Sequence, residues 1–231
     1  MHPLGCYGRK AHDPVRLAAV AVVKPHVMAA TEPLPLILLR PKILTKPLLV
    51  LNNILPTCTV AGLINSANAK AEMNGWDFVV DQQKLLAFYG LVYGCDPTPE
   101  AISKTDGLVM LDVLEYAQKH GFYINNTSGP LVPNFSVIDT SNPIGLKDAI
   151  FAHGTAYVGV DLYTADEQPD ADYTGGLETA GDPVGGHCLD PKQWSATGYT
   201  DATWGQEIET DNAWIDSRMV EAYAIDWTFS S

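Results

Sequence analysis

The chain has 231 residues, of which 46% are hydrophobic and 18% are charged, a composition typical of a globular protein with a sizeable core. No apolar run approaches the roughly 18 residues needed to span a bilayer, and the four cysteines contain no Cys-x-x-Cys pair. A membrane protein, a disulfide scaffold and a structural zinc site are therefore not expected, and the net charge of −13 makes nucleic acid an unfavourable partner.

The first 57 residues differ from the rest in charge and in proline content. They hold seven basic and two acidic residues, a net charge of +5. The remaining 174 residues hold seven basic and 25 acidic residues, a net charge of −18. Eight of the sixteen prolines fall in this part, which predicts an extended arm over residues 1–50. A basic arm beside an acidic body predicts that the arm lies on an acidic surface, either of this body or of a neighbouring molecule.

The N-terminal apolar run is too short to suggest a leader. Residues 17–23 are apolar, but Lys24-Pro25-His26 interrupts them, so no signal peptide is expected. The location in the cell stays open, with a cytoplasmic assembly and a virus particle as the two settings considered.

Three helices are predicted in the first half of the body. Apolar residues recur at helical spacing over 58–71, and Asn74-Gly75 supplies a stop. Asp81 is a candidate N-cap for a second helix that ends at Gly94, and Asp106 for a third that ends near residue 121.

The second half changes to strands. In chain order the pattern predicts a helix over 141–153, a strand over 157–162, an acidic surface loop over 164–186, strands around 187–203, a helix near 214–220 and a strand over 222–227. The body thus has a helical part followed by a part rich in strands.

Cys58 carries the clearest chemical signal. It opens the first helix of the body, where unpaired backbone N–H groups and the helix dipole favour a thiolate. A Gly-Gly-His sequence follows far downstream at residues 185–187, and Trp204-Gly205 comes after it.

This arrangement resembles the papain-like cysteine peptidases, and looks most similar to a divergent group of such proteins found in bacteria and their phages. The matching stretches are Leu55-Pro56-Thr57-Cys58, the helix 107–121, the unit 145–162, Gly185-Gly186-His187, Thr203-Trp204-Gly205 and the tail 213–224. The resemblance covers about residues 50–231. It implies an α+β fold of two lobes, a helical lobe over about 51–128 led by Cys58 and a β-rich lobe over about 129–231 bearing His187.

The resemblance also implies roles for individual residues. Cys58 would be the nucleophile and His187 the base that later protonates the leaving amine. Asn52, six residues before Cys58, stands where the family has its oxyanion amide, and Asn53 could serve instead. The plainer alternative for both asparagines is capping of a turn, and for Cys58 and His187 it is a buried apolar side chain and a hydrogen-bonded loop histidine.

Two departures from the family pattern concern the histidine. Ala202 stands where the family carries the asparagine that orients the imidazole, and its neighbours Asp201 and Thr203 are expected to point to the opposite face of the strand. Trp204 is expected to shield the histidine or to be a core residue. Pro191 follows closely after His187, so the strand there is predicted to be short, bulged or at an edge.

Structural roles are expected for two further cysteines and two further histidines. Cys95 and Cys188 are interpreted as ordinary, partly buried thiols, and Cys6 as a candidate for a bond between molecules. His120 and His153 lie at predicted helix ends, where they interact with the dipole. No cofactor and no metal are expected.

Two hypotheses of function follow. The first is a cysteine peptidase or amidase that acts on a peptide through Cys58 and His187, with activity lowered by the departures at Ala202 and Pro191. The second is a catalytically idle structural or decorating component of a larger assembly, such as a phage particle. That component would dock through its basic arm on copies of itself or on other subunits of the particle.

Overall fold

The computed structural model describes residues 9–11, 13, 15–16, 49–76, 78–122, 130–167 and 171–229. The helices are α2 (Cys58–Asn74), α3 (Gln82–Tyr93), α4 (Pro99–Ile102), α5 (Met110–His120), α6 (Pro143–His153) and α7 (Asn212–Arg218). The strands are β1 (Arg9–Lys10), β2 (Leu108–Val109), β3 (Leu131–Val137), β4 (Tyr157–Tyr163), β5 (Pro183–Trp194), β6 (Gly198–Thr203), β7 (Gln206–Asp211) and β8 (Met219–Phe229). None of the helices described is long and apolar enough to cross a membrane.

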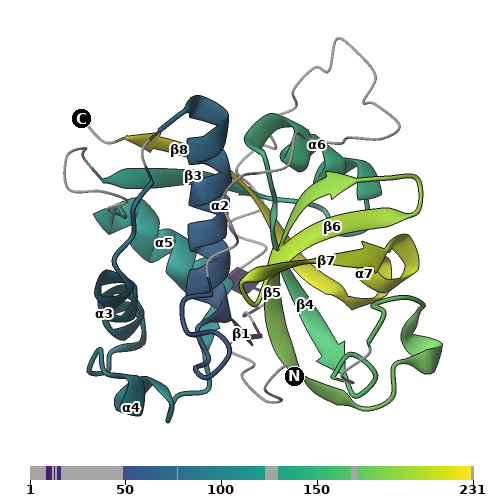
Figure 1. The fold of residues 1–231 in the computed structure, drawn as a ribbon, viewed down its shortest axis with the longest axis horizontal. Helices are drawn as coiled ribbons and strands as arrows, with labels where there is room; N and C mark the ends of the chain where they lie inside the picture. Colours follow the sequence, from purple (N-terminus) through teal and green to yellow (C-terminus); the bar gives the residue numbers. More distant parts are fainter. Residues whose placement is uncertain are drawn as a thin grey trace.

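Helix α2 lies in the middle of the molecule, with α3, α4 and α5 on one side and the strands β4 to β7 on the other (Figure 1). It is buried along most of its length, which small side chains make possible. At Gly62 an added Cβ would lie 2.7 Å from the Tyr157 ring, so this position needs glycine for α2 to approach β4. The predicted helix is confirmed, including its end at Asn74-Gly75.

The helical lobe follows the prediction except at one cap and in the short helix α4, which the sequence pattern does not predict. Asp81 caps α3 by accepting a hydrogen bond from the Gln83 N–H, as predicted. The prediction for Asp106 is wrong, because α5 begins only at Met110 and Val109 is its N-cap. The two residues before Met110 form β2, and the Asp106 carboxylate instead binds Lys10 of the N-terminal strand at 2.7 Å.

One curled sheet runs through the molecule in the order β2-β1-β5-β4-β8-β3, with β6 on β5 and β7 on β6. Strand β5 changes partners along its length, since residues 183–189 pair with β4 and residues 190–194 with β6. A bulge between Pro191 and Gln193 lies in the second half, where the proline has no N–H to give. The predicted bulge is therefore present, but β5 is a long strand.

Part of the predicted arm belongs to the sheet. Strand β1 lies between β2, to which it is parallel, and β5, where Arg9 pairs with Gly186. A Cβ at Gly186 would lie 2.7 Å from the Arg9 carbonyl oxygen, so only glycine lets the two strands come this close. Cys6 and residues 17–48 lie outside the described residues.

Basic residues of the arm pair with acidic residues of the body. The buried Arg9 guanidinium binds Glu221 at 2.8 Å and also Asp161. Arg16 binds the exposed carboxylates of Asp112 and Glu115 on α5. At Arg9, Lys10 and Arg16 the acidic surface that the sequence predicts is thus that of the chain's own body.

Two apolar clusters confirm the two-lobed α+β fold. One joins α2, α3 and α5 and includes Tyr223 and Trp227 of β8. The other joins α6 and α7 to strands β4 to β8 and includes Met219 and Ala222 of the same strand. Strand β8 therefore packs into both lobes (Figure 1).

Candidate active site

Cys58 is the first residue of α2 and is 1% exposed. The preceding Thr57 does not cap the helix with its side chain, because its hydroxyl donates to the Val50 carbonyl at 2.8 Å. No acidic residue lies in the first turn of α2. The first N–H groups of the helix and its dipole thus favour negative charge at the Cys58 sulfur.

His187 lies on β5 and is completely buried. Its Nε2 lies 2.5 Å from the Thr203 hydroxyl, which also donates to the Cys188 carbonyl at 3.3 Å. The Thr203 hydroxyl has one hydrogen, and it donates this hydrogen to the Cys188 carbonyl. It must therefore accept from His187, so Nε2 carries the proton of the neutral imidazole and Nδ1 is unprotonated. Nδ1 is buried and has no hydrogen-bond partner among the described residues, which is the state of a base ready to accept a proton.

The contact with Thr203 corrects the expectation that this side chain points away from the histidine. Asp190 pairs with Ala202 across β5 and β6, which places Thr203 opposite Leu189. Residues opposite one another share a face of the sheet, and so do residues two apart on a strand. Thr203 therefore lies on the face of His187, one residue later than the family spacing predicts.

Trp204 stacks on the imidazole of His187, with ring centroids 4.1 Å apart and planes 15° apart. The residue has a left-handed backbone, with φ of 45°, at the turn between β6 and β7. The next residue, Gly205, packs against Leu49 of the segment that leads into α2. The turn that covers the histidine thus contacts the segment that carries the thiol.

The two asparagines before the thiol lie in this same segment. Asn52 is 2% exposed, and its backbone N–H donates to the Leu49 carbonyl at 2.8 Å. The Oδ1 atoms of Asn52 and Asn53 are buried and have no hydrogen-bond partner in the part of the chain that the structure describes. The Asn52 backbone therefore closes a turn, while its side-chain carbonyl stays unsatisfied.

Cys188, next to the histidine, contacts Cys58. Its side chain is buried and forms a hydrogen bond with Cys58. Burial and this neighbouring sulfur raise the pKa of the Cys188 thiol well above its usual value. Because successive residues of a strand point to opposite faces, Cys188 faces α2, and His187 faces Thr203 and Trp204. The contact between α2 and β5 thus joins Cys58 to Cys188, while the His187 Nδ1 forms no hydrogen bond with the Cys58 sulfur.

Two carboxylates are buried near this region, Asp190 on β5 and Asp201 on β6. Asp190 is completely buried, and neither of its carboxylate oxygens has a hydrogen-bond partner among the described residues. Asp201 is also completely buried and accepts one hydrogen bond, from the Thr210 hydroxyl at 2.7 Å. Burial raises the pKa of Asp201 to about 7 and lowers that of nearby Lys192. The sequence interpretation gave neither carboxylate a role, because their burial depends on the pairing of β5 with β6.

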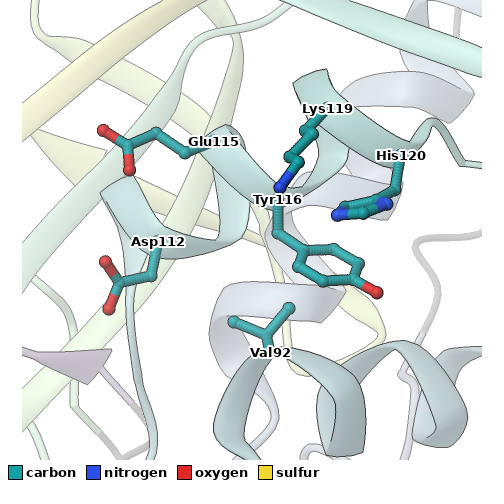
Figure 2. Close-up of a pocket in the computed structure, with 6 residues that line it drawn as sticks. All are labelled: Val92, Asp112, Glu115, Tyr116, Lys119 and His120. Carbon is teal, nitrogen blue, oxygen red and sulfur yellow. The ribbon is translucent and has the colours of Figure 1, made fainter.

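The other two described histidines, His120 and His153, have structural contacts. The His120 ring stacks on Tyr116 at 4.3 Å, and both line a shallow hollow on α5 (Figure 2). Asp112 and Glu115 lie at the other end of that hollow, where Arg16 binds them. His153 lies 3.8 Å from Asp226. The hollow holds no cysteine, so it is not the site of the nucleophile.

No protein-family model and no curated protein sequence matches the chain. Solved structures do match. Xylellain, a cysteine protease from Xylella fastidiosa, has a TM-score of 0.69 at 11% identity, over 98% of this chain and 97% of that one. The fold is papain-like.

Other papain-like neighbours agree with this result. Digestive procathepsin L 3 from the larval midgut of Tenebrio molitor gives a TM-score of 0.56 at 13% identity, over 85% of this chain and 71% of that one. A Carica candamarcensis cysteine protease in complex with E-64 gives 0.51 at 12% identity, over 74% and 89%. Such low identities show the papain-like fold alone, and they do not support a bacterial and phage group in particular.

Proposed function

We propose that this protein is a cysteine peptidase or amidase that works through Cys58 and His187. The observation that carries the proposal is the state of the imidazole, with Nε2 fixed by Thr203 and Nδ1 left unpaired on the strand that contacts the thiol-led helix. A general base needs this combination of fixed tautomer and open lone pair.

The reaction would be an acyl transfer in two stages. The His187 Nδ1 takes the proton of the Cys58 thiol, and the thiolate attacks the carbonyl carbon of the scissile amide. The imidazolium then protonates the leaving amine, and an acyl-thioester remains on Cys58. In the second stage water attacks the thioester, with His187 again as base, and the acid product leaves.

Negative charge develops on the carbonyl oxygen in both stages. The backbone N–H of Cys58, at the start of α2, is one proposed donor to this oxyanion. The side-chain amide of Asn52 is the other, because it is buried in the segment that contacts the Trp204-Gly205 turn. Trp204 would keep water away from the Nε2 hydrogen bond.

A peptide-like epoxide of the E-64 type tests the proposal. We expect it to alkylate Cys58 much faster than Cys6, Cys95 or Cys188, as measured by peptide mapping, because Cys58 has the helix dipole and, in this proposal, His187 as its base. His187→Ala should remove the difference, and Cys58→Ala should remove the fast label. Equal labelling of all four thiols in the folded protein would contradict the proposal.

A second candidate is a catalytically idle component of a larger assembly, such as a phage particle. The burial of both Cys58 and His187 favours it, since a peptide reaches neither unless the covering residues move. Docking would then use arm residues outside the described part of the chain, on copies of the protein or on other subunits. In that case the epoxide would find no fast thiol in the folded protein.

A further inference from the structure

Cys188 has no part in the acyl-transfer chemistry, yet it is the side chain that touches the nucleophile. It forms a hydrogen bond with Cys58, and both residues belong to the apolar cluster around α2. Strand β5 holds Cys188 in place, because its register with β4 sets Cys188 opposite Gly159. Two thiols are therefore held against each other from elements that are 130 residues apart in the chain.

The surroundings of Cys188 are closed and polar. Tyr157 and Tyr223 lie close enough that a charge on Cys188 would act on their hydroxyl groups. Arg9 and Glu221 lie near as well, and the arginine favours a thiolate there while Glu221 opposes it. With the negative charge of Cys58 beside it, Cys188 stays a neutral thiol.

We propose that Cys58 and Cys188 form a reversible disulfide when the site meets hydrogen peroxide, and that this bond switches the nucleophile off. The inference rests on the proposed function, in which Cys58 is the reactive thiolate. The contact of the two sulfur-bearing side chains, one on α2 and the other on β5, is the geometric basis.

The oxidation proceeds in two balanced steps. The Cys58 thiolate attacks one oxygen of hydrogen peroxide, the O–O bond breaks, and the leaving hydroxide takes a proton from the His187 imidazolium to become water. Cys58 is then a sulfenic acid. The Cys188 sulfur attacks the Cys58 sulfur, and the hydroxyl leaves as a second water with the Cys188 proton. Two thiols lose two electrons and two protons, and one peroxide becomes two waters.

The first step also prepares the second. Burial raises the Cys188 pKa most, and the Cys58 hydrogen bond and negative charge raise it further. A neutral sulfenic acid at Cys58 removes that charge, so the Arg9 guanidinium acts with less opposition and Cys188 ionises more easily. Cys95 has no such arrangement, because burial and Asp96 raise its pKa and no other cysteine acts on it there.

Intact-protein mass spectrometry after stoichiometric peroxide tests the switch without any need for turnover. The wild-type protein should lose about 2 Da, and non-reducing peptide mapping should join the peptides that contain Cys58 and Cys188. Dithiothreitol should restore the original mass. Cys188→Ala and Cys188→Ser should instead gain about 16 and then 32 Da at Cys58, because no second thiol traps the sulfenic acid. Cys95→Ala is the matched control and should behave as wild type.

Further oxidation of Cys58 at the same rate in wild type and in the Cys188 variants would overturn the switch. So would a disulfide that joins any other pair. The peptide map of the wild type decides this even if a Cys188 variant fails to fold. A failure of the switch is distinct from a failure of the proposed function: reduced protein that takes the epoxide at Cys58 but forms no disulfide keeps the function and loses the switch. Protein that forms the disulfide but takes no epoxide at Cys58 when reduced would keep the disulfide and lose the proposed function.

Discussion

The hydroxyl of Thr203 orients the His187 imidazole, which is the role that the resemblance gives to an asparagine side chain. It accepts a hydrogen bond from His187 and donates one to the Cys188 backbone, so it fixes both the ring orientation and the tautomer. Trp204, the next residue, closes over the same ring. Two neighbouring residues therefore hold the imidazole from its edge and from its face.

Thr203→Val should keep the shape of this side chain and remove the hydrogen bond to His187. We expect kcat on a peptide substrate to fall by about tenfold to a hundredfold with KM unchanged, because orientation of the base acts on the chemical step. The acid limb of the pH–kcat profile should shift as well, since the imidazole loses the partner that fixes its tautomer.

Thr203→Ser is the control for that change. It retains a hydroxyl at the same position and should recover most of the wild-type kcat. A valine variant with the kcat and pH profile of the wild type would show that Thr203 only fills space.

At the scale of elements, strand β5 combines the histidine, the second thiol and a buried carboxylate. Its partner change from β4 to β6 buries Asp190 on the face toward α2, where its side chain approaches Gly62. Asp201 of β6 is opposite Pro191 and is buried on the other face of the sheet. Burial of a carboxyl group favours its neutral form, which predominates at acidic pH, so the stability of this part of the sheet depends on pH.

Asp201→Asn tests this dependence on pH. The folded state raises the pKa of Asp201 from 3.8 to about 7, so the folded state binds a proton more tightly than the unfolded chain does. The stability that results is fully present below about pH 4 and is lost as the pH rises through about 7. Asparagine cannot ionise, so the variant should be more stable than wild type at pH 8, by up to about 4 kcal/mol, and close to it at pH 4.

Urea unfolding at the two pH values measures the difference. Asp172→Asn, which neutralises an exposed carboxylate of the acidic loop, is the matched control and should show little dependence on pH. An Asp201→Asn variant that is equally destabilised at both pH values would contradict the argument.

The sequence predicts elements well where their ends are set locally. Asp81 and Gly94 bound α3 through their own backbone contacts, so a short stretch of sequence contains the information. Strands β1 and β2 have two residues each and exist only because they pair with each other and with β5. No local pattern marks such strands, and the wrong cap at Asp106 follows from the same cause.

The residues of the candidate site also fall into two groups, those that a local motif predicts and those that depend on strand pairing. Motif order predicts Cys58 and His187 because each has a local signature. Thr203 and Cys188 were assigned to other roles, since their contacts depend on which residues oppose one another across β5, β6 and α2. The face of a side chain on a paired strand is set by the register, and register is a tertiary property.

At the scale of the whole molecule, the N-terminal strand links the two lobes. Lys10 binds Asp106 on the helical side, while Arg9 binds Glu221 and Asp161 on the β-rich side. The side chains of Arg9 and Glu221 are 3% and 0% exposed, so their charges are shielded from water. A buried pair of this kind is costly to break from one side.

Arg9→Met should therefore lower the free energy of unfolding by about 3–5 kcal/mol, because it leaves the Glu221 carboxylate buried without its partner. Arg16→Met removes an exposed pair and should cost about 0–1 kcal/mol. Urea unfolding at neutral pH compares the two, and the double variant Arg9→Met with Glu221→Gln should recover part of the loss. Equal effects of the two arginine variants would show that burial does not decide the cost.

The place of β1 also fixes what can be trimmed from the protein. A chain that starts after residue 48 would lack the strand between β2 and β5 and would leave Glu221 without an arginine. The described residues that join the two lobes are therefore far apart in sequence, with β1 separated from β2 and β5. If the chain were opened between residues 17 and 48, strand pairing and the ion pairs of Arg9 would be among the contacts that hold the short piece to the long one.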